Sequence, residues 1–318
     1  MDNTRTNNIE SDKKTCAVDT DTASSLDCKT CTISLLASGI LQTAFNAEDF
    51  QGLSRRKIWR LISIFSSEFF ATAVLLFLLC SVIQASLFKG EANHLTVGTS
   101  AGFAVGTSVM IFGHISGSHI NPALSLAAVL LSEISLPMCL FYIVAQCAGA
   151  TFGYSLTRAI LPESVSSPTS NSSYVSFCCS GPTSQLEDSP SQVLLVELIG
   201  TAILCWAFCS ALDKRNLNKH DSLPVKFAIV IIALALPLGY YSGCSVNPAR
   251  SFGPALYNQH WKHHWVYWIG PIIGSSLTAI LYRCLFDPVL TETATNDTRR
   301  DPATINLRKN SHKCEEEP

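Results

Sequence analysis

The sequence has few charged residues. Only 14% of its 318 residues are Asp, Glu, Lys or Arg, against roughly a quarter in a typical soluble domain, while 47% are hydrophobic. The charges that exist are concentrated in residues 1–60, in residues 213–226 and after position 287, which leaves long apolar segments between them. This pattern excludes an ordinary soluble domain and indicates a membrane protein.

Other features are also missing. The net charge of −2 gives no basic field for nucleic acid. The first 60 residues are polar and contain no charged region followed by an apolar one, so we expect no cleaved signal peptide. Because the sequence shows neither a nucleophile with a base and an orienting group nor a cluster of metal ligands, we expect no enzyme activity, no cofactor and no metal.

The 13 cysteines do not suggest a disulfide framework. Cys28 and Cys31 form a lone Cys-x-x-Cys without the second pair of a structural zinc site; we interpret their segment as disordered, with palmitoylation as a weaker alternative. Adjacent Cys178 and Cys179 lie in a loop, where they can oxidise or pair with another chain, and the sequence does not select between these. Several cysteines lie inside apolar segments, where a thiol acts as a small hydrophobe. We interpret these as packing residues: Cys80, Cys139, Cys147, Cys205, Cys209 and Cys284.

Six apolar segments have about the 20 residues that a helix needs to cross the hydrocarbon core. They are 61–87, 96–112, 136–157, 192–212, 223–240 and 265–285. The predicted fold is therefore an all-α membrane protein with a channel domain at 60–287, between disordered cytoplasmic tails at 1–59 and 288–318.

The positive residues that flank the segments predict the orientation. They gather before the first segment and between the fourth and fifth, at Arg55, Arg56, Lys57, Arg60, Lys214, Arg215, Lys219 and Lys226. The alternate loops offer little beyond Lys89 and Lys262, so both termini are expected in the cytoplasm and loop 161–190 outside. That loop carries the sequon Asn171-Ser172-Ser173, which is either glycosylated or unused.

An internal repeat organises the chain. The pattern Gly-x-x-Ser-Gly-x-x-x-Asn-Pro-Ala-x-Ser begins at Gly113 and again at Gly239, 126 residues later. Repeat one covers about 60–160 and repeat two about 191–287, with three spans each. Because an odd number of spans inverts the second copy, the functional site is expected where the repeats meet, near the membrane midplane. The flanking helices repeat as well, in the pairs Glu68 and Glu197, Thr72 and Thr201, and Gly149 and Gly274.

Each repeated pattern predicts a half-helix. Residues 122–131 would extend only about 15 Å as a helix, half of the ~30 Å core. Pro122 suits the first helical turn and Asn121 the preceding cap. A pure capping role is one interpretation of Asn121 and Asn247. Two such asparagines at this depth favour another, in which they face a wet cavity.

Taken together, these features resemble the aquaporin family over residues 60–287. The resemblance implies a homotetramer in the plasma membrane with one pore in each subunit, no cofactor and no catalysis. Water, small uncharged solutes and membrane lipid would be its partners. The residues that carry it are Asn121-Pro122-Ala123, Asn247-Pro248-Ala249, Arg250, Glu68, Glu197 and Ser242-Gly243-Cys244.

The resemblance also implies a mechanism. Asn121 and Asn247 would donate amide hydrogens to one water oxygen, and the positive ends of both half-helices would exclude cations and protons. Glu68 and Glu197 would brace the two loops by accepting backbone hydrogen bonds. A proton relay is the alternative, disfavoured because the two glutamates are symmetry mates.

The family's outer filter has four positions, which fall on Ala101, Ala235, Cys244 and Arg250. Water-selective members usually have an aromatic residue and a histidine at the first two, so the alanines indicate a wide opening. This is similar to the glycerol-transporting entomoglyceroporins of insects, and we expect passage of water and glycerol, with urea as a further candidate.

Two features depart from the glycerol pattern. Ser251 replaces the aspartate of common glycerol facilitators, and Tyr267-Trp268 is similar to water-selective members. A strictly water-selective channel therefore stays an alternative. A junctional protein with a closed pore is a weaker one, because the outward loops 88–94 and 258–264 are short.

Overall fold

The computed structural model describes residues 54–88, 93–161, 178–181 and 188–286, together with 44, 48–52 and 186. The expectations about the two tails, the Cys28 and Cys31 pair and the sequon at Asn171 lie outside the described residues.

The described elements are all helical, and six helices are long and apolar enough to cross a membrane. The predicted six-span fold is confirmed, and the protein is an integral membrane protein. The six are α2 (Arg55–Phe88), α3 (His94–Ser116), α5 (Leu136–Ile160), α7 (Pro190–Leu212), α8 (Leu223–Ser242) and α10 (Val266–Phe286). The described chain also contains two short helices, α4 (Pro122–Leu130) and α9 (Pro248–Asn258), and two 3-10 helices, η1 (Glu48–Phe50) and η3 (Lys214–Ser222).

Local sequence explains where the short helices begin. Asn121 and Asn247 have extended backbones, and each side-chain oxygen accepts the backbone N–H two residues later, at 2.9 Å and 3.0 Å. Proline follows at the first helical position, where a missing N–H costs nothing. Both half-helices therefore start at the predicted residues.

Glycines allow the spans to touch. A Cβ on Gly149 of α5 would lie 2.1 Å from the backbone oxygen of Phe69 on α2, and one on Gly274 of α10 would lie 2.2 Å from that of Leu198 on α7. Such close approach between membrane helices is possible only with small residues. The repeat-related glycines thus fix the same contact in both halves.

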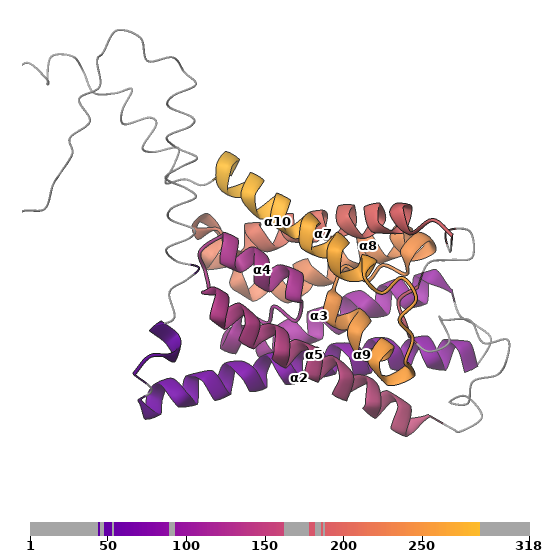
Figure 1. Ribbon diagram of the computed structural model, residues 1–318, viewed down its shortest axis with the longest axis horizontal. Coiled ribbons are helices and arrows are strands. Elements are labelled where there is room, and N and C mark those ends of the chain that lie inside the picture. Colours follow the sequence, from indigo (N-terminus) through magenta and orange to yellow (C-terminus); the bar gives the residue numbers. More distant parts are fainter. Residues whose placement is uncertain are drawn as a thin grey trace, which may run out of the picture.

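The half-helices enter the bundle from opposite ends, α4 in the left half of Figure 1 and α9 in the right half. At nine residues α4 is only about 14 Å long, too short to span. Each packs against the other repeat, α4 along α10 and α9 along α5, where a Cβ on Gly253 would lie 2.7 Å from the backbone of Ala150. The two repeats are therefore interlocked rather than merely adjacent.

The interpretation of Cys80 as a free packing thiol was wrong. Cys80 on α2 forms a disulfide with Cys178, with a Cα–Cα distance of 5.5 Å. The disulfide joins residues 178–181, part of the loop between α5 and α7, to α2, although the two cysteines lie 98 residues apart in sequence. The other five cysteines of that group are free thiols; Cys139, Cys205 and Cys209 are buried and Cys147 is half-buried, whereas Cys284 is exposed on α10.

Candidate functional site

A cavity of about 500 Å³ runs between the two repeats. Its lining includes Asn121 and Asn247 and all four residues predicted for the outer filter, which are Ala101, Ala235, Cys244 and Arg250. The proline and alanine of each repeated motif do not line it. They are buried in the first turns of α4 and α9, at Pro122, Ala123, Pro248 and Ala249.

The loops before the half-helices have matching backbones. Ser118 and Ile120 have φ of 47°, and Cys244 and Val246 have φ of 45° and 44°, in the left-handed region that non-glycine residues rarely adopt. Such residues persist only when their surroundings enforce them, and they cluster at functional sites. Among the described residues, none donates a hydrogen bond to the carbonyls of 117–119 or 243–245. Ser118, His119, Cys244 and Ser245 line the cavity, so their carbonyls can accept hydrogen bonds from molecules inside it.

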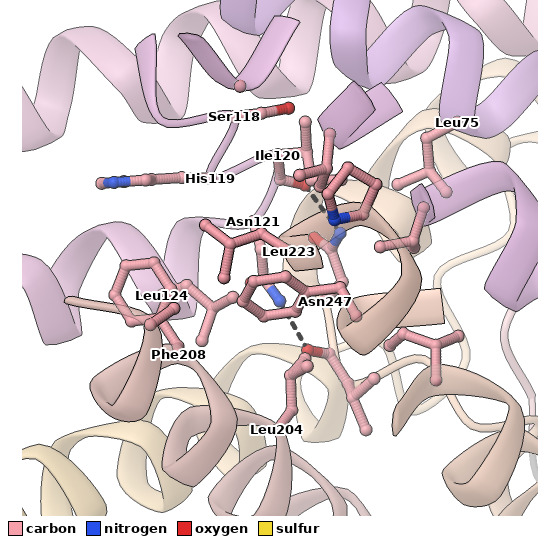
Figure 2. A pocket seen from close by; sticks show the side chains of 18 of the residues that line it. Leu75, Ser118, His119, Ile120, Asn121, Leu124, Leu204, Phe208, Leu223 and Asn247 are labelled. Atoms are coloured by element: carbon pink, nitrogen blue, oxygen red, sulfur yellow. Dashed lines mark hydrogen bonds between the residues drawn. The ribbon is translucent and has the colours of Figure 1, made fainter. Parts of the chain in front are cut away.

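The two asparagines bond across the repeats. Asn121 Nδ2 donates to the carbonyl of Val246 at 2.8 Å, and Asn247 Nδ2 donates to that of Ile120 at 2.7 Å. Figure 2 shows both bonds in the middle of the cavity. Because an amide has two hydrogens, each asparagine keeps a second one for a molecule in the cavity. In each asparagine the side-chain oxygen caps the half-helix, while the nitrogen bonds to the other repeat and lies at the cavity wall.

Glu68 holds the first loop. Its carboxylate is fully buried and accepts from the backbone N–H groups of His119 (3.0 Å) and Ile120 (2.8 Å). It also accepts from the Ser116 hydroxyl at 2.6 Å and the Gln146 amide at 2.8 Å. All these partners donate to the carboxylate, which thereby joins the first loop to α3 and α5.

Glu197 holds the second loop in the same way. It is also fully buried, and it accepts from the backbone N–H groups of Ser245 (2.9 Å) and Val246 (2.7 Å) and from the Ser242 hydroxyl at 2.6 Å. A tyrosine on the sixth span completes this brace, since Tyr267 donates to the carbonyl of Ser242 at 2.9 Å. Tyr142 does the same for the carbonyl of Ser116 in repeat one, at 2.8 Å.

The outer end of the cavity combines one cation with small side chains. Arg250 is buried, and its Nη1 donates to the carbonyl of Cys178 at 3.2 Å and to Ser180 Oγ at 2.6 Å. Ala101 and Ala235 contribute only methyl groups. Sequence reasoning missed Ser180 as a partner of Arg250, because it lies 70 residues away in a loop with no motif.

Comparison with known proteins decides the family. The model of the family described as "Major intrinsic protein" matches residues 55–282. The chain belongs to this family. Its curated relatives include Aquaporin-4 of Mus musculus, 34% identical over 244 residues covering 75% of this chain and 71% of the relative. Aquaporin-1 of Homo sapiens is 33% identical over 247 residues, covering 74% of this chain and 84% of the relative.

A solved structure shows the same fold. It is the aquaglyceroporin from Plasmodium falciparum, which matches with a TM-score of 0.66 and 21% identity over 73% of this chain and 99% of that one. Members of the major intrinsic protein family are passive channels for water and small solutes rather than enzymes. The expectation that this chain catalyses no reaction is thereby confirmed.

The inner part of the cavity in this family member contains a histidine that sequence reasoning missed. His119 lies on the cavity wall between Tyr142 and Phe208, with ring centroids 4.9 Å and 5.2 Å away, and its Nδ1 lies 3.2 Å from Ser125 Oγ. The available signal was its place inside the repeat, two residues before Asn121. The cavity lining also includes His114, Asp221 and Leu223.

Proposed function

We propose that this protein is a passive channel for water and small neutral solutes, with glycerol foremost and urea as a further candidate, and that it excludes ions and protons. The observation that carries the proposal is the composition of the outer end of the cavity, where two of four positions are alanine. A glycerol molecule needs room for its carbon chain and donors for its hydroxyls. Ala101 and Ala235 leave that room, and Arg250 supplies the donors.

The likeness to named proteins gives this proposal partial support. The curated relatives are named as aquaporins, and the fold neighbour is titled an aquaglyceroporin. At 21% identity that neighbour supports the fold of this chain but not the identity of its solute. A strictly water-selective channel is the competing function, supported by Ser251 and Tyr267, and the wide filter is favoured because solutes would contact it directly.

The midplane supports the exclusion of ions. The N-terminal ends of α4 and α9 converge there, and each carries partial positive charge from the aligned peptide dipoles of its helix. A cation in this place would lose its hydration shell against an unfavourable potential. The free hydrogens of Asn121 and Asn247 would hold one water oxygen, so that its hydrogens point along the file and away from the centre.

The two buried glutamates act as braces in this proposal. Neither Glu68 nor Glu197 lines the cavity, and all their hydrogen bonds hold the loops and neighbouring helices in place. A relay would need a chain of groups that pass protons between them. The hydrogen bonds instead support two separate braces, one in each repeat.

Membrane placement and assembly complete the proposal. We assign residues 60–287 to the channel domain, with both termini in the cytoplasm of a plasma-membrane homotetramer. The disulfide supports this orientation, since Cys178 lies in the loop that would face the oxidising exterior, opposite to the basic cluster at Arg55.

Permeability measurements test the proposal. Purified protein in liposomes should accelerate swelling in isosmotic glycerol and shrinkage in hyperosmotic sucrose. Ala235→His, alone and with Ala101→Phe, should lower glycerol permeability by about tenfold or more, the discrimination that steric changes in a pocket commonly give. Water permeability should fall far less, because water still fits in single file.

The same changes on the outer face of the bundle give matched controls. Ala233→His on α8 and Ala148→Phe on α5 alter exposed alanines that do not line the cavity, so both permeabilities should stay unchanged. If the parent protein passes water but no glycerol, the water-selective alternative replaces this proposal. If both permeabilities fall together in the filter variants, Ala101 and Ala235 do not form the filter.

A further inference from the structure

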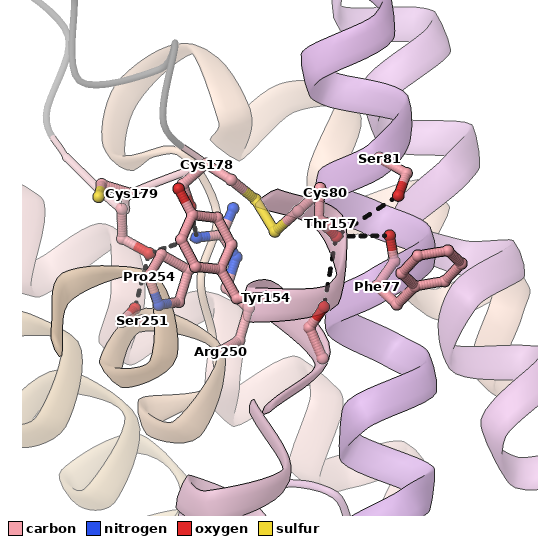
Figure 3. The surroundings of a disulfide bond; sticks show 12 residues. Phe77, Cys80, Ser81, Tyr154, Thr157, Cys178, Cys179, Arg250, Ser251 and Pro254 are labelled. Atoms are coloured by element: carbon pink, nitrogen blue, oxygen red, sulfur yellow. Dashed lines mark hydrogen bonds between the residues drawn. A yellow bond between two sulfur atoms is a disulfide. The ribbon is translucent and has the colours of Figure 1, made fainter. Parts of the chain in front are cut away.

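A short part of the outward loop is fastened over the outer end of the cavity. We refer to residues 178–181 as the outer strap. The Cys80–Cys178 disulfide ties its first residue to α2, and both cysteines are at most 1% exposed. Figure 3 shows the disulfide beside Tyr154 and Arg250. At its other end Gly181 lies against the second pore loop, where its carbonyl oxygen is 3.4 Å from the position of a Cβ on Gly243.

The outer strap supplies the acceptors of the Arg250 side chain. Nη1 of Arg250 donates to the carbonyl of Cys178 and to Ser180 Oγ, and none of the ion pairs among the described residues includes Arg250. Ser180 Oγ lies 2.7 Å from Ser251 Oγ, which links the outer strap to α9 itself. The guanidinium is therefore held by one residue that forms the disulfide and by another two positions away.

We propose that the Cys80–Cys178 disulfide and Ser180 are positioning residues for the filter, and that they set solute selectivity by holding the Arg250 guanidinium against the outer wall. This rests on the proposed function, in which Arg250 borders the outer end of the path. The disulfide acts on the filter through the Cys178 carbonyl, and Ser180 acts directly on the guanidinium.

The physical reason lies in the reach of an arginine. Its side chain has several rotatable bonds and a charge that requires acceptors. Without the outer strap those acceptors would be water and the carbonyls of Cys244 and Ser245, two residues that line the cavity. A released guanidinium would then occupy the lumen for part of the time. Glycerol permeability would then fall more than water permeability, because glycerol needs the full width of the filter.

Removal of the disulfide should leave a folded protein. Asn258 on α9 gives the outer strap a second attachment, since its Nδ2 donates to Cys179 Sγ at 3.5 Å and to the Tyr154 hydroxyl at 2.8 Å. The expected result is a less closely fixed outer strap rather than an unfolded channel.

The test compares glycerol and water permeability in liposomes, both normalised to folded protein. The double variant Cys80→Ser/Cys178→Ser and the single variant Ser180→Ala should each lower the glycerol-to-water ratio by about fivefold, within the range for residues that share one hydrogen-bond network. Ser180→Thr keeps the hydroxyl and should restore the ratio. Cys147→Ala is the control, because it removes a free sulfur packed against the same core as Cys80.

A double-mutant cycle separates positioning from general destabilisation. In an Arg250→Ala background the same two changes should not alter the ratio further, because the group that they position is absent. The inference would be overturned if the changes had equal effects with Arg250 and with Arg250→Ala. It would also be overturned if they left the glycerol-to-water ratio unchanged in the protein that retains Arg250. Alkylation of both Cys80 and Cys178 in denatured, unreduced protein would overturn it as well, since the disulfide would then not exist.

These outcomes differ from failure of the proposed function. A parent that passes water but no glycerol would refute the solute assignment, and the same cycle would then be followed in water permeability, which the variants should lower only when Arg250 is present. A parent that passes neither would refute the channel and this inference together.

Discussion

The two repeats share their framework and differ along the path. Both use a buried glutamate, a tyrosine and left-handed backbone to shape a loop, and both end that loop in an asparagine that bonds to the other repeat. Several differences fall on residues that line the cavity. Repeat one has Ser118, His119 and Leu124 where repeat two has Cys244, Ser245 and Arg250.

The contrast between Leu124 and Arg250 has the largest functional weight. Both are the third residue of a half-helix and both line the cavity, but the repeats are inverted, so they lie on opposite sides of the midplane. At this position of the half-helix one side of the path therefore has an apolar side chain and the other a cation.

The braces should give the largest effect when removed. Glu68→Ala would leave four donors without an acceptor and Glu197→Ala three, at about 1–3 kcal/mol for each orphaned buried donor. Both variants should lose most folded protein, Glu68→Ala more, as size-exclusion profiles of detergent extracts would show. Glu133→Gln, which lies outside both networks, is the control. A well-folded Glu68→Ala channel would contradict the bracing role.

Charge at the midplane should have the next largest effect. Asn121→Asp or Asn247→Asp replaces an amide donor with a carboxylate beside two half-helix N-termini, which weakens the barrier to cations. Sodium and proton leak should appear, measured by conductance and by pH-sensitive dye in liposomes. If both variants fold and pass neither sodium nor protons, the barrier to cations lies at Arg250. Ion exclusion would then depend on repeat two alone.

The two repeats also differ in a thiol on the cavity wall, and this difference predicts where mercurials bind. Cys244 is a free thiol on the cavity wall, and the corresponding residue in repeat one is Ser118. Mercurials should block the parent, Cys244→Ser should abolish the block, and Ser118→Cys added to it should restore one. Osmotic permeability before and after treatment measures each step. A block that persists in Cys244→Ser would point to another free thiol, and Cys178 is excluded because it forms a disulfide.

The smallest effect should come from the loops that follow the half-helices. Burial lowers the pKa of His264, after α9, to about 4, and its Nε2 accepts from Trp268 Nε1 at 3.0 Å. Because the unfolded chain binds the proton more readily, this histidine's contribution to stability is lost as pH falls from above 6.5 towards 4. Burial raises the pKa of Glu133, after α4, so its contribution has the opposite sign and grows as pH falls.

Melting curves between pH 8 and pH 4.5 would resolve the two loops. His264→Gln should flatten the loss of thermal stability on acidification, whereas Glu133→Gln should steepen it. If the melting temperature changed with pH at the same rate in both variants and the parent, neither loop would contribute measurably to the pH dependence of stability.

Much of the fold follows from local and periodic features of the sequence. Apolar length predicted the six spans to within a few residues, except that α2 begins at Arg55 rather than near 61 because the basic segment continues the helix beyond the apolar core. The repeat predicted the half-helices, and the family resemblance implied that Glu68 would accept backbone hydrogen bonds. Its bonds from Ser116 and Gln146 were not predicted.

The missing parts depend on tertiary contacts between remote segments. Cys80 looks like a packing residue because its neighbours in sequence are apolar, and only the folded loop brings Cys178 to it. Ser180 has no motif, so its bond to Arg250 could not be predicted from spacing. The cross-repeat bonds of Asn121 and Asn247 need the inverted packing of both halves before they can form.

Those cross-repeat bonds also bear on how the chain is made. The first half leaves the ribosome before the second, yet the Asn121 amide finds its acceptor only when Val246 arrives, and the Ile120 carbonyl waits for Asn247. Until then the first loop would expose unpaired groups at the centre of the bilayer. We therefore expect α4 to reach its final position only together with α9, as a late and shared step of membrane assembly.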